Sequence, residues 1–326
     1  MKLSLKALLA VVVAFGLVLG AFGPACVPAA QAKEEYTFYM VSHGGPATPF
    51  WGVVMKGMND AARTVGVKAI YMGPEKFSIK ELVDMLEGVI AAKPDGIVVT
   101  ITSVEPLDKP LRRAISMGIP VIAANVKDPR PPEEAIPYLC YVGTDQYLTG
   151  VKAARRLLQE FRPKRAVVGI QEVGHIGLEA RAKGFIDIMK EKGVPAEKLD
   201  ITPDLAKGVE AYRSYLLRHP DTDAIFTVTR AGAEAAVKVV EEEGLVGKVK
   251  LVNTDLSKTI INAIKNGTMV ATAEQQQYLQ GYLPIIFLYK YKKQGLCPTG
   301  DVLTGPFIVD KSNVAIVEKT VAEGYR

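Results

Sequence analysis

The strongest constraint on the fold of this chain is the alternation of predicted strands and helices from residue 36 to residue 309. The aromatic and β-branched run at residues 36–42 predicts a strand, which His43-Gly-Gly-Pro46 ends. Thr48 followed by Pro49 predicts a helix start, because a proline at the first helical position loses no hydrogen bond. Repeated alternation of this kind predicts a doubly wound α/β fold with parallel sheets.

The same pattern continues along the chain. Strands are expected at residues 36–42, 67–72, 96–101, 119–125, 138–143, 166–170, 199–202, 224–228, 248–254, 269–273 and 302–309. Helices are expected from about residue 49 and over residues 78–92, 107–117, 146–161, 178–192, 209–218, 231–243, 258–266 and 277–294. The proline-rich residues 126–137 predict a loop, as a candidate lid or linker. No long flexible linker interrupts the alternation, so we expect two lobes with a ligand cleft between them.

Residues 1–32 have the features of a cleaved signal peptide, which predicts a periplasmic or otherwise exported protein. Lys2 and Lys6 precede an apolar run at residues 7–23, and Ala30-Gln-Ala32 resembles a cleavage site. The short run and its Gly23-Pro24 break disfavour an uncleaved anchor. Cys26 lacks the upstream aliphatic residue expected of a lipoprotein.

Composition narrows the partners and the redox chemistry. The net charge is +5, and without the two lysines of residues 1–32 it is +3, spread along the rest of the chain, so nothing indicates a nucleic-acid partner. Cys140 and Cys297 could form a disulfide in an oxidising compartment or remain two buried thiols, and the sequence leaves both alternatives open.

Catalytic and cofactor motifs are missing from the sequence. It has no phosphate-binding loop, no dinucleotide-binding glycine motif, no zinc-protease motif and no nucleophile elbow. The three histidines, His43, His175 and His219, are widely spaced, which disfavours a metal or acid–base cluster. We therefore expect neither catalysis nor a cofactor.

Polar side chains instead follow the predicted strands at the edge where parallel sheets bind ligands. They are Ser42, Asn125, Asp145, Thr229, Asp255 and Gln275, with Arg181 at the start of a helix. Each alone fits a helix cap or a loop, but together they favour a polyhydroxy ligand held by planar side chains. Phe50 and Trp51 point about 100° apart on a helix, so one can stack on a ligand while the other packs in the core.

In order and spacing, these residues resemble the periplasmic sugar-binding proteins of the ribose and galactose type, the receptors of ABC importers. The resemblance covers residues 36–310. Its markers include Thr48-Pro-Phe-Trp51, Pro94-Asp-Gly-Ile-Val98, Val142-Gly-Thr-Asp145, Glu179-Ala-Arg-Ala-Lys-Gly-Phe185 and Asn253-Thr-Asp255. It implies a three-crossing hinge, with one lobe at residues 33–144 plus 276–306 and the other at 145–275 plus 307–326.

The resemblance also implies the site. Phe50 and Trp51 match the family's stacking aromatics, Arg181 its hydroxyl-binding arginine, Asp255 its carboxylate and Gln275 its hinge amide. The full set of candidate ligand-binding residues is His43, Thr48, Phe50, Trp51, Asn125, Asp145, Arg181, Thr229, Asp255 and Gln275. Departures at Asn125-Val126 and Thr229 argue against ribose itself, and no obvious aromatic lies near residues 204–208 to complete a sandwich. Arg230 could add charge to the cleft, although a solvated position is favoured.

The main functional hypothesis is a monomeric receptor that captures a small sugar or polyol and delivers it to an ABC permease. A sensor subunit that presents a sugar-like ligand to a membrane receptor is the alternative, since the same fold permits it. A carbohydrate-modifying enzyme is less favoured, because Asp255 has no evident partner carboxylate. A transcriptional regulator would need a DNA-binding headpiece where the signal peptide stands.

Overall fold

The computed structural model describes residues 36–326, in which the strands form two six-stranded sheets. The predicted signal peptide and Cys26 lie outside the described residues. The first sheet and its helices are called the first lobe here, and the second sheet and its helices the second lobe. Within residues 36–326, no helix is long and apolar enough to cross a membrane.

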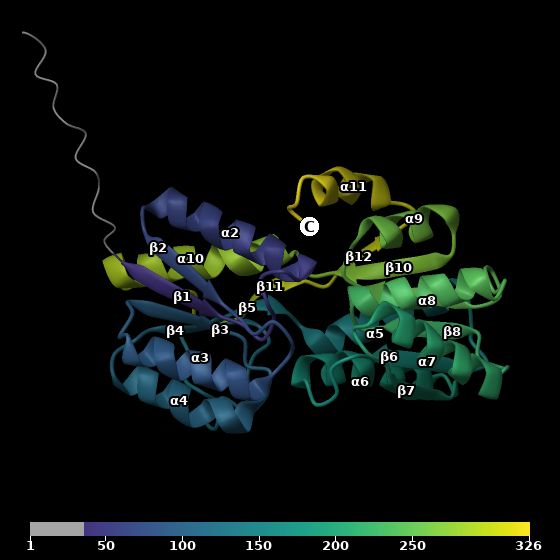
Figure 1. Ribbon diagram of the computed structural model, residues 1–326, viewed down its shortest axis with the longest axis horizontal. Helices are drawn as coiled ribbons and strands as arrows, with labels where there is room; N and C mark the ends of the chain where they lie inside the picture. The colour runs from purple at the N-terminus through teal and green to yellow at the C-terminus, as the bar shows by residue number, and fades with distance from the viewer. Residues whose placement is uncertain (1–35) are drawn as a thin grey trace, which may run out of the picture. The chain divides into compact units, whose positions relative to one another are not determined.

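The first lobe contains the following elements (Figure 1): β1 (Thr37–Val41), α2 (Pro49–Val65), β2 (Lys68–Met72), α3 (Ile79–Ala91), β3 (Gly96–Val99), α4 (Val104–Ser116), β4 (Val121–Asn125), β5 (Tyr141–Thr144), α10 (Gln277–Gln294) and β11 (Val302–Gly305). The second lobe contains α5 (Gln146–Glu160), β6 (Ala166–Ile170), α6 (Ile176–Glu191), β7 (Ala196–Asp200), α7 (Leu205–Arg218), β8 (Ala224–Thr227), α8 (Arg230–Glu242), β9 (Lys250–Thr254), α9 (Lys258–Asn266), β10 (Met269–Glu274), β12 (Phe307–Asp310) and α11 (Val314–Ala322).

Both sheets have the same strand order. It is β2-β1-β3-β4-β5-β11 in the first and β7-β6-β8-β9-β10-β12 in the second, and only β12 runs antiparallel to its neighbour. The strand order reverses between β1 and β3, and between β6 and β8, and ligands bind beyond the strand ends at such points. The predicted doubly wound α/β class is confirmed.

The chain passes between the sheets three times: after β5, after β10 and between β11 and β12. The expected single strand at residues 302–309 is wrong, because it forms two strands in different sheets. Pro306 separates them, and its lack of a backbone N–H prevents the ladder from continuing. The final helix α11 was not expected from the sequence.

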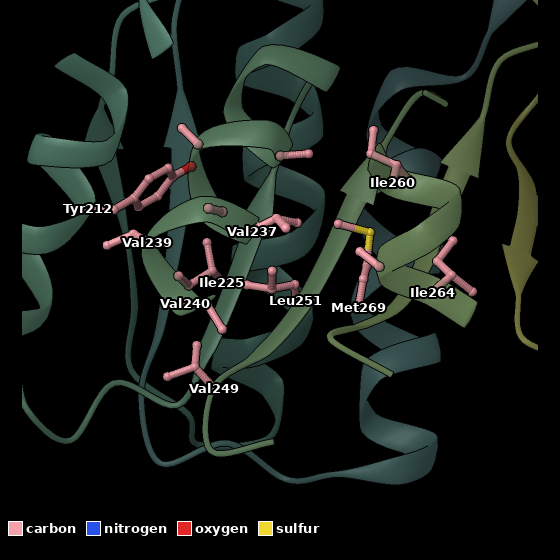
Figure 2. Close-up of a cluster of buried hydrophobic side chains, with 14 of the residues drawn as sticks. Tyr212, Ile225, Val237, Val239, Val240, Val249, Leu251, Ile260, Ile264 and Met269 are labelled. Carbon is pink, nitrogen blue, oxygen red and sulfur yellow. The ribbon is translucent and has the colours of Figure 1, made fainter. Parts of the chain in front are cut away.

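Each sheet is covered by helices on both faces, which explains why inner strands such as β3 and β8 are apolar throughout. In the first lobe, α3 and α4 cover one face and α2 and α10 the other (Figure 1). Neighbouring strand residues alternate between these faces: Ile97 packs under α3 and α4, whereas Val98 packs under α2 and α10. In the second lobe, α7, α8 and α9 enclose a cluster that includes Ile225, Leu251 and Met269 (Figure 2).

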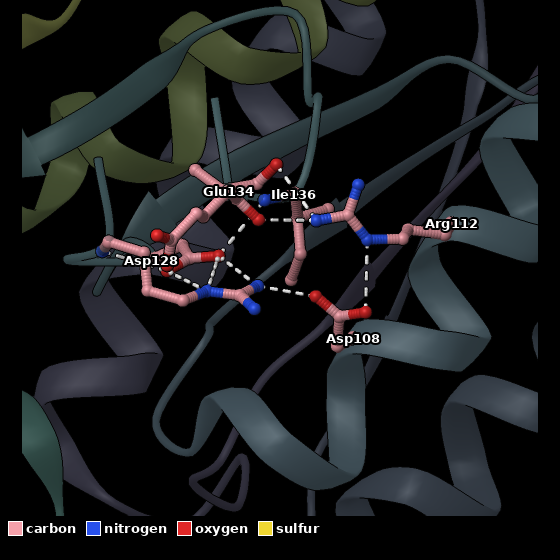
Figure 3. A network of polar contacts seen from close by, with 7 residues as sticks. Asp108, Arg112, Asp128, Glu134 and Ile136 are labelled. Carbon is pink, nitrogen blue, oxygen red and sulfur yellow. Dashed lines mark hydrogen bonds and ion pairs between the residues drawn. The ribbon is translucent and has the colours of Figure 1, made fainter. Parts of the chain in front are cut away.

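The proline-rich loop after β4 is attached to α4 by a polar network (Figure 3). The Asp128 carboxylate accepts hydrogen bonds from the backbone N–H of Ile136 (2.9 Å) and from Arg130, which also pairs with Asp108. Arg112 bonds the same Asp108 and donates to the carbonyl of Ala135 (3.0 Å). These bonds argue against the expectation that the loop is a free lid.

Helices α2 and α10 approach each other closely at two glycines. A Cβ added to Gly57 would lie 2.0 Å from the carbonyl oxygen of Tyr278, and one added to Gly281 would lie 1.9 Å from that of Val54. Gly52, also in α2, is exposed, and an added Cβ there meets no atom within 4 Å.

We predict opposite effects of alanine at Gly57 and Gly52. Gly57→Ala should lower the free energy of unfolding by about 1–3 kcal/mol, because the new methyl group overpacks the helix contact. Gly52→Ala should leave it unchanged or raise it by up to about 1 kcal/mol, because alanine favours an exposed helix. Urea unfolding midpoints measure both. Equal midpoints would contradict the close approach of α2 and α10.

Cys140 and Cys297 are free thiols whose sulfur atoms lie 3.7 Å apart. Burial raises the pKa of both thiols, which slows their oxidation, because the thiolate is the reactive form. In protein lacking residues 1–32, we predict two titratable thiols after purification under reducing conditions. Prolonged treatment with oxidised dithiothreitol should leave none, with the protein still monomeric on a non-reducing gel. Two thiols remaining after this treatment would contradict the proximity of the two sulfurs.

Candidate ligand-binding cavity

A cavity of about 950 Å³ lies between the two lobes, beyond the carboxyl ends of their parallel strands. The candidate residues that line it are His43, Thr48, Phe50, Trp51, Asn125, Arg181, Thr229, Asp255 and Gln275. Asp145 is the exception: its carboxylate accepts the backbone N–H of Leu148 (2.8 Å) and caps α5. The placement of Asp145 in the site is therefore corrected, because a helix start consumes its side chain.

The buried guanidinium of Arg181, 3% exposed, is at the centre of the cavity's polar contacts. It donates to Oε1 of Gln146 (2.6 Å), to the carbonyl of Val228 (2.7 Å) and to Oε1 of Gln275 (2.9 Å). The amide nitrogen of Gln275 donates in turn to Oδ1 of Asp255 (2.6 Å). Gln275 therefore joins a buried cation to a buried carboxylate, and both must find partners because they have lost their water.

Burial favours the neutral forms of both Arg181 and Asp255. Burial lowers the pKa of Arg181 against the opposing pull of Asp255. Burial likewise raises the pKa of the Asp255 carboxyl, while Arg181 and Gln275 oppose the rise. These groups form an arrangement that ligand hydroxyl groups, which both donate and accept, can complete.

Two cavity residues have left-handed backbone conformations. Asn125 ends β4 with a φ of 63°, and Asp255 follows β9 with a φ of 82°. The two strands occupy equivalent places in the two sheets. Such backbones are unfavourable outside glycine and concentrate at ligand sites, where the fold holds side chains ready.

Trp51 belongs both to the core and to the cavity wall. The indole is 5% exposed and packs within the apolar cluster under α2 and α10. Its ring also contacts Phe50 (centroids 5.0 Å apart) and the imidazole of His43 (4.9 Å). The stacking and core interpretations of this residue are therefore compatible.

Several cavity residues were not expected from the sequence. They include Phe77, Gln171, Glu172, His175, Asp204, Lys207 and Glu234. Gln171 and Glu172 directly follow β6, so their strand-end position was a usable signal. Arg230 lines the cavity rather than being simply solvated, and it pairs with Glu234 (2.8 Å). The hydroxyl oxygen of Thr229 and Oε1 of Gln171 are buried without a hydrogen-bond partner among residues 36–326.

The structure brings together two histidines that the sequence separates. The Nε2 atoms of His43 and His175 lie 3.2 Å apart, and with a carboxylate oxygen of Glu172 they form a set of donor atoms within 4.8 Å of one another. The wide spacing of the histidines in the sequence therefore did not exclude a contact between their side chains, because the two lobes bring His43 and His175 together. Burial lowers the pKa of His175 to about 3 and raises that of Glu172 to about 7.

Comparisons with known proteins agree with this architecture. A periplasmic binding protein domain matches residues 38–295. The chain is 26% identical over 303 residues to the xylose/arabinose-binding protein of Sulfolobus acidocaldarius, covering 89% of this chain and 74% of that protein. It is 27% identical over 243 residues to the D-allose-binding periplasmic protein of Escherichia coli, covering 70% of this chain and 76% of that one.

Solved structures show the same fold. A carbohydrate transporter from Acidothermus cellulolyticus, in complex with myo-inositol, is 28% identical with a TM-score of 0.82, covering 89% of this chain and 99% of that one. A periplasmic sugar-binding protein from Legionella pneumophila is 29% identical with a TM-score of 0.77, covering 83% and 99%. The chain belongs to the periplasmic binding protein family.

Proposed function

We propose that this protein is an exported receptor that captures a small neutral sugar or polyol between its lobes and delivers it to an ABC importer. The observation that carries the proposal is the Arg181–Gln275–Asp255 chain, which lies in a cavity lined by both lobes. Relatives named for xylose, arabinose and allose, and a structural neighbour that holds myo-inositol, support the same ligand class. The proposal includes cleavage after residue 32, the lobe boundaries given above and a monomeric state.

The charge of the cavity favours a neutral ligand over a sugar acid or phosphate. The lining cations are Lys76, Arg181, Lys207 and Arg230, and the lining acids are Glu75, Glu172, Asp204, Glu234 and Asp255. The two signs are nearly balanced, and Arg230 is neutralised by Glu234. An anionic ligand would find no surplus of positive charge to offset the loss of its water.

Binding for transport is favoured over hydrolysis of the ligand, although the sequence argument that Asp255 has no partner carboxylate no longer holds. Asp255 does share the cavity with other carboxyls, such as Glu172. Asp255 is, however, held as a hydrogen-bond acceptor by Gln275 and by the backbone N–H of Arg230 (3.4 Å), a role that suits binding of ligand hydroxyls rather than donation of a proton to a leaving group. Incubation with each sugar followed by product analysis tests this. Any turnover would favour the enzyme hypothesis.

A thermal-shift screen over xylose, arabinose, allose, ribose and myo-inositol is the first test of the ligand class. A ligand at about 100 times its dissociation constant adds about 2.7 kcal/mol of stability. Glucuronate and ribose 5-phosphate serve as charged comparisons. A larger shift with the charged compounds would contradict the neutral ligand.

Asp255→Asn should weaken binding of the best ligand from that screen by about 2–4 kcal/mol, because it removes a charged acceptor from a buried site. Asparagine keeps the size of the side chain and tolerates the left-handed backbone. Arg181→Ala should have a similar or larger effect. Calorimetry measures affinity, and Arg165→Ala, which breaks exposed ion pairs of the second lobe, is the matched control. Unchanged affinity in Asp255→Asn would remove Asp255 from the site.

Trp51 is the only tryptophan, so its fluorescence reports on one wall of the cavity. Because the indole is 5% exposed, we predict blue-shifted emission and weak iodide quenching before ligand is added. Binding should then change the intensity in a saturable way, because the indole borders the cavity. The measurement is a fluorescence titration with a ligand whose binding calorimetry has confirmed. An unchanged spectrum at saturation would place Trp51 in the core alone.

A further inference from the structure

The contact between His43 and His175 joins the two lobes directly. His43 follows β1 in the first lobe, and His175 precedes α6 in the second. His43 is 8% exposed and His175 is 2% exposed. The planes of the two rings cross at 78°, and the ring centroids lie 4.6 Å apart. Beside them, the backbone N–H of Ile176 donates to the carbonyl of Thr102 (3.2 Å), a second bond between the lobes. The two bonds form one small inter-lobe contact.

The helix start fixes the proton of His175. Its Nδ1 faces the backbone N–H groups of Gly177 (3.1 Å) and Leu178 (3.3 Å), both of which can only donate. Nδ1 must therefore carry a lone pair, and the neutral ring must hold its proton on Nε2. That proton points to the other ring, because Nε2 of His175 lies 3.2 Å from Nε2 of His43.

The proton of His43 is then fixed as well. Its Nε2 must accept from His175, so the ring proton lies on Nδ1 and donates to the hydroxyl oxygen of Thr100 (2.9 Å). The same oxygen also accepts the backbone N–H of His43 (3.0 Å), which holds the residue in place. The whole series, from the start of α6 to the end of β3, has one arrangement of protons that satisfies every nitrogen.

Each neutral ring holds one proton, and protonation of either ring breaks this arrangement. On Nε2 of His43 it would face the N–H of His175, and on Nδ1 of His175 it would face two backbone N–H groups. The charged or titratable neighbours among the described residues are Arg181 from α6 and Glu172 from the loop before it. Their other neighbours include the rings of Trp51 and Phe77 and the hydroxyl of Thr100, none of which carries a charge.

This tautomer also argues against a metal ion in the cluster. A neutral imidazole has one lone pair, and that of His175 is directed at the start of α6. Its Nε2 carries the proton, so it cannot bind a metal unless the cap of α6 is lost. The donor set of His43, Glu172 and His175 is therefore better described as a hydrogen-bonded contact.

We propose that His43 and His175 are positioning residues that hold the lobes closed over the ligand through a hydrogen bond that exists only while both rings are neutral. The inference rests on the proposed function, because closure matters only if the lobes enclose a ligand. It makes ligand affinity depend on pH through residues that need not touch the ligand.

The direction in which ligand affinity changes with pH follows from the pKa shifts of the groups in this contact. Burial lowers the pKa of both rings, so the open form takes up protons as the pH falls below about 6.5, while the closed form does not. The contribution of the pair is present above that pH and is lost below it. Glu172 acts in the opposite direction: burial raises its pKa to about 7, so its ionisation opposes closure as the pH rises from about 4.5 towards 7. The two histidines outweigh the single carboxyl of Glu172, so lowering the pH weakens closure of the lobes.

Nitrogen-detected NMR of the histidine rings tests the contact without any sugar. The chain has three histidines, and the His219→Asn variant assigns the third signal. At pH 7.5 we expect the Nε2–H form for His175 and the Nδ1–H form for His43. Mixed tautomers and ordinary titration near pH 6.5, both alone and with 50 mM D-xylose or myo-inositol, would overturn the proposal. A stoichiometric shift of both rings by one equivalent of zinc chloride would overturn it in favour of a metal site.

Calorimetry with the sugar that gives the larger thermal shift of these two tests the link to affinity. We expect about fourfold weaker binding at pH 5.5 than at pH 6.5, because the effect of Glu172 offsets part of the effect of the two histidines. His175→Asn keeps an acceptor for the start of α6 but loses the inter-lobe donor, and should weaken binding about three- to tenfold at pH 7. His43→Gln keeps an acceptor for His175 without a titratable ring and should bind more strongly than His43→Ala.

The double variant His43→Gln/His175→Asn separates a closure contact from mere structural damage. It should lose the decline towards acid, and binding should be equal or tighter at pH 5.5, because only Glu172 then titrates. A decline equal to that of the wild type would overturn the proposal. If neither sugar binds, the proposed ligand class fails, while the ring tautomers of the protein alone still decide whether the contact exists.

Discussion

Burial of the Arg181 guanidinium is the constraint on which the rest of the site depends. A cation that has lost its water must be surrounded by acceptors, and here Gln146, the Val228 carbonyl and Gln275 supply them. Gln146 lies at the start of α5 and Gln275 just after β10, at two of the three places where the chain passes between the sheets. Satisfying one charge therefore fixes both crossings relative to the cavity.

The same contacts extend into the first lobe. The amide of Gln146 donates to the carbonyl of Asn125 (2.6 Å), and the amide of Asn125 donates to Gln280 (2.9 Å). Gln280 donates in turn to the carbonyl of Gln275 (3.1 Å). The left-handed residues Asn125 and Asp255 thus belong to the same hydrogen-bonded network. Such networks are rigid because each member would be left unpaired if another moved.

The repeated strand order explains why these residues meet. The parallel strands of each sheet have their carboxyl ends on the same side, and the polar side chains follow these ends. His43 follows β1 and Glu172 follows β6, the equivalent strands of the two lobes. Lobes that face each other across a cavity therefore bring together residues more than a hundred positions apart, including His43 and His175.

The sequence determined the class of fold and most of its elements, because periodicity, caps and turn residues are local. The start of α2 follows from Pro49 at its first position and that of α3 from the Ser78 cap. Strand-end position identified Asp255 and Gln275 as candidates, and the start of a helix identified Arg181. Asp145 shows the limit of that reasoning, because a strand-end carboxylate can cap a helix or face a ligand with the same sequence signal.

Only the tertiary structure decided which residues meet across the lobes. The split of residues 302–309 into β11 and β12 depends on which sheet offers a free edge, and no local pattern records that. Trp51 serves core and wall at once because α2 packs on α10 while its first turn borders the cavity. The pairing of His43 with His175, and the single arrangement of protons that it requires, depends on the packing of one lobe against the other.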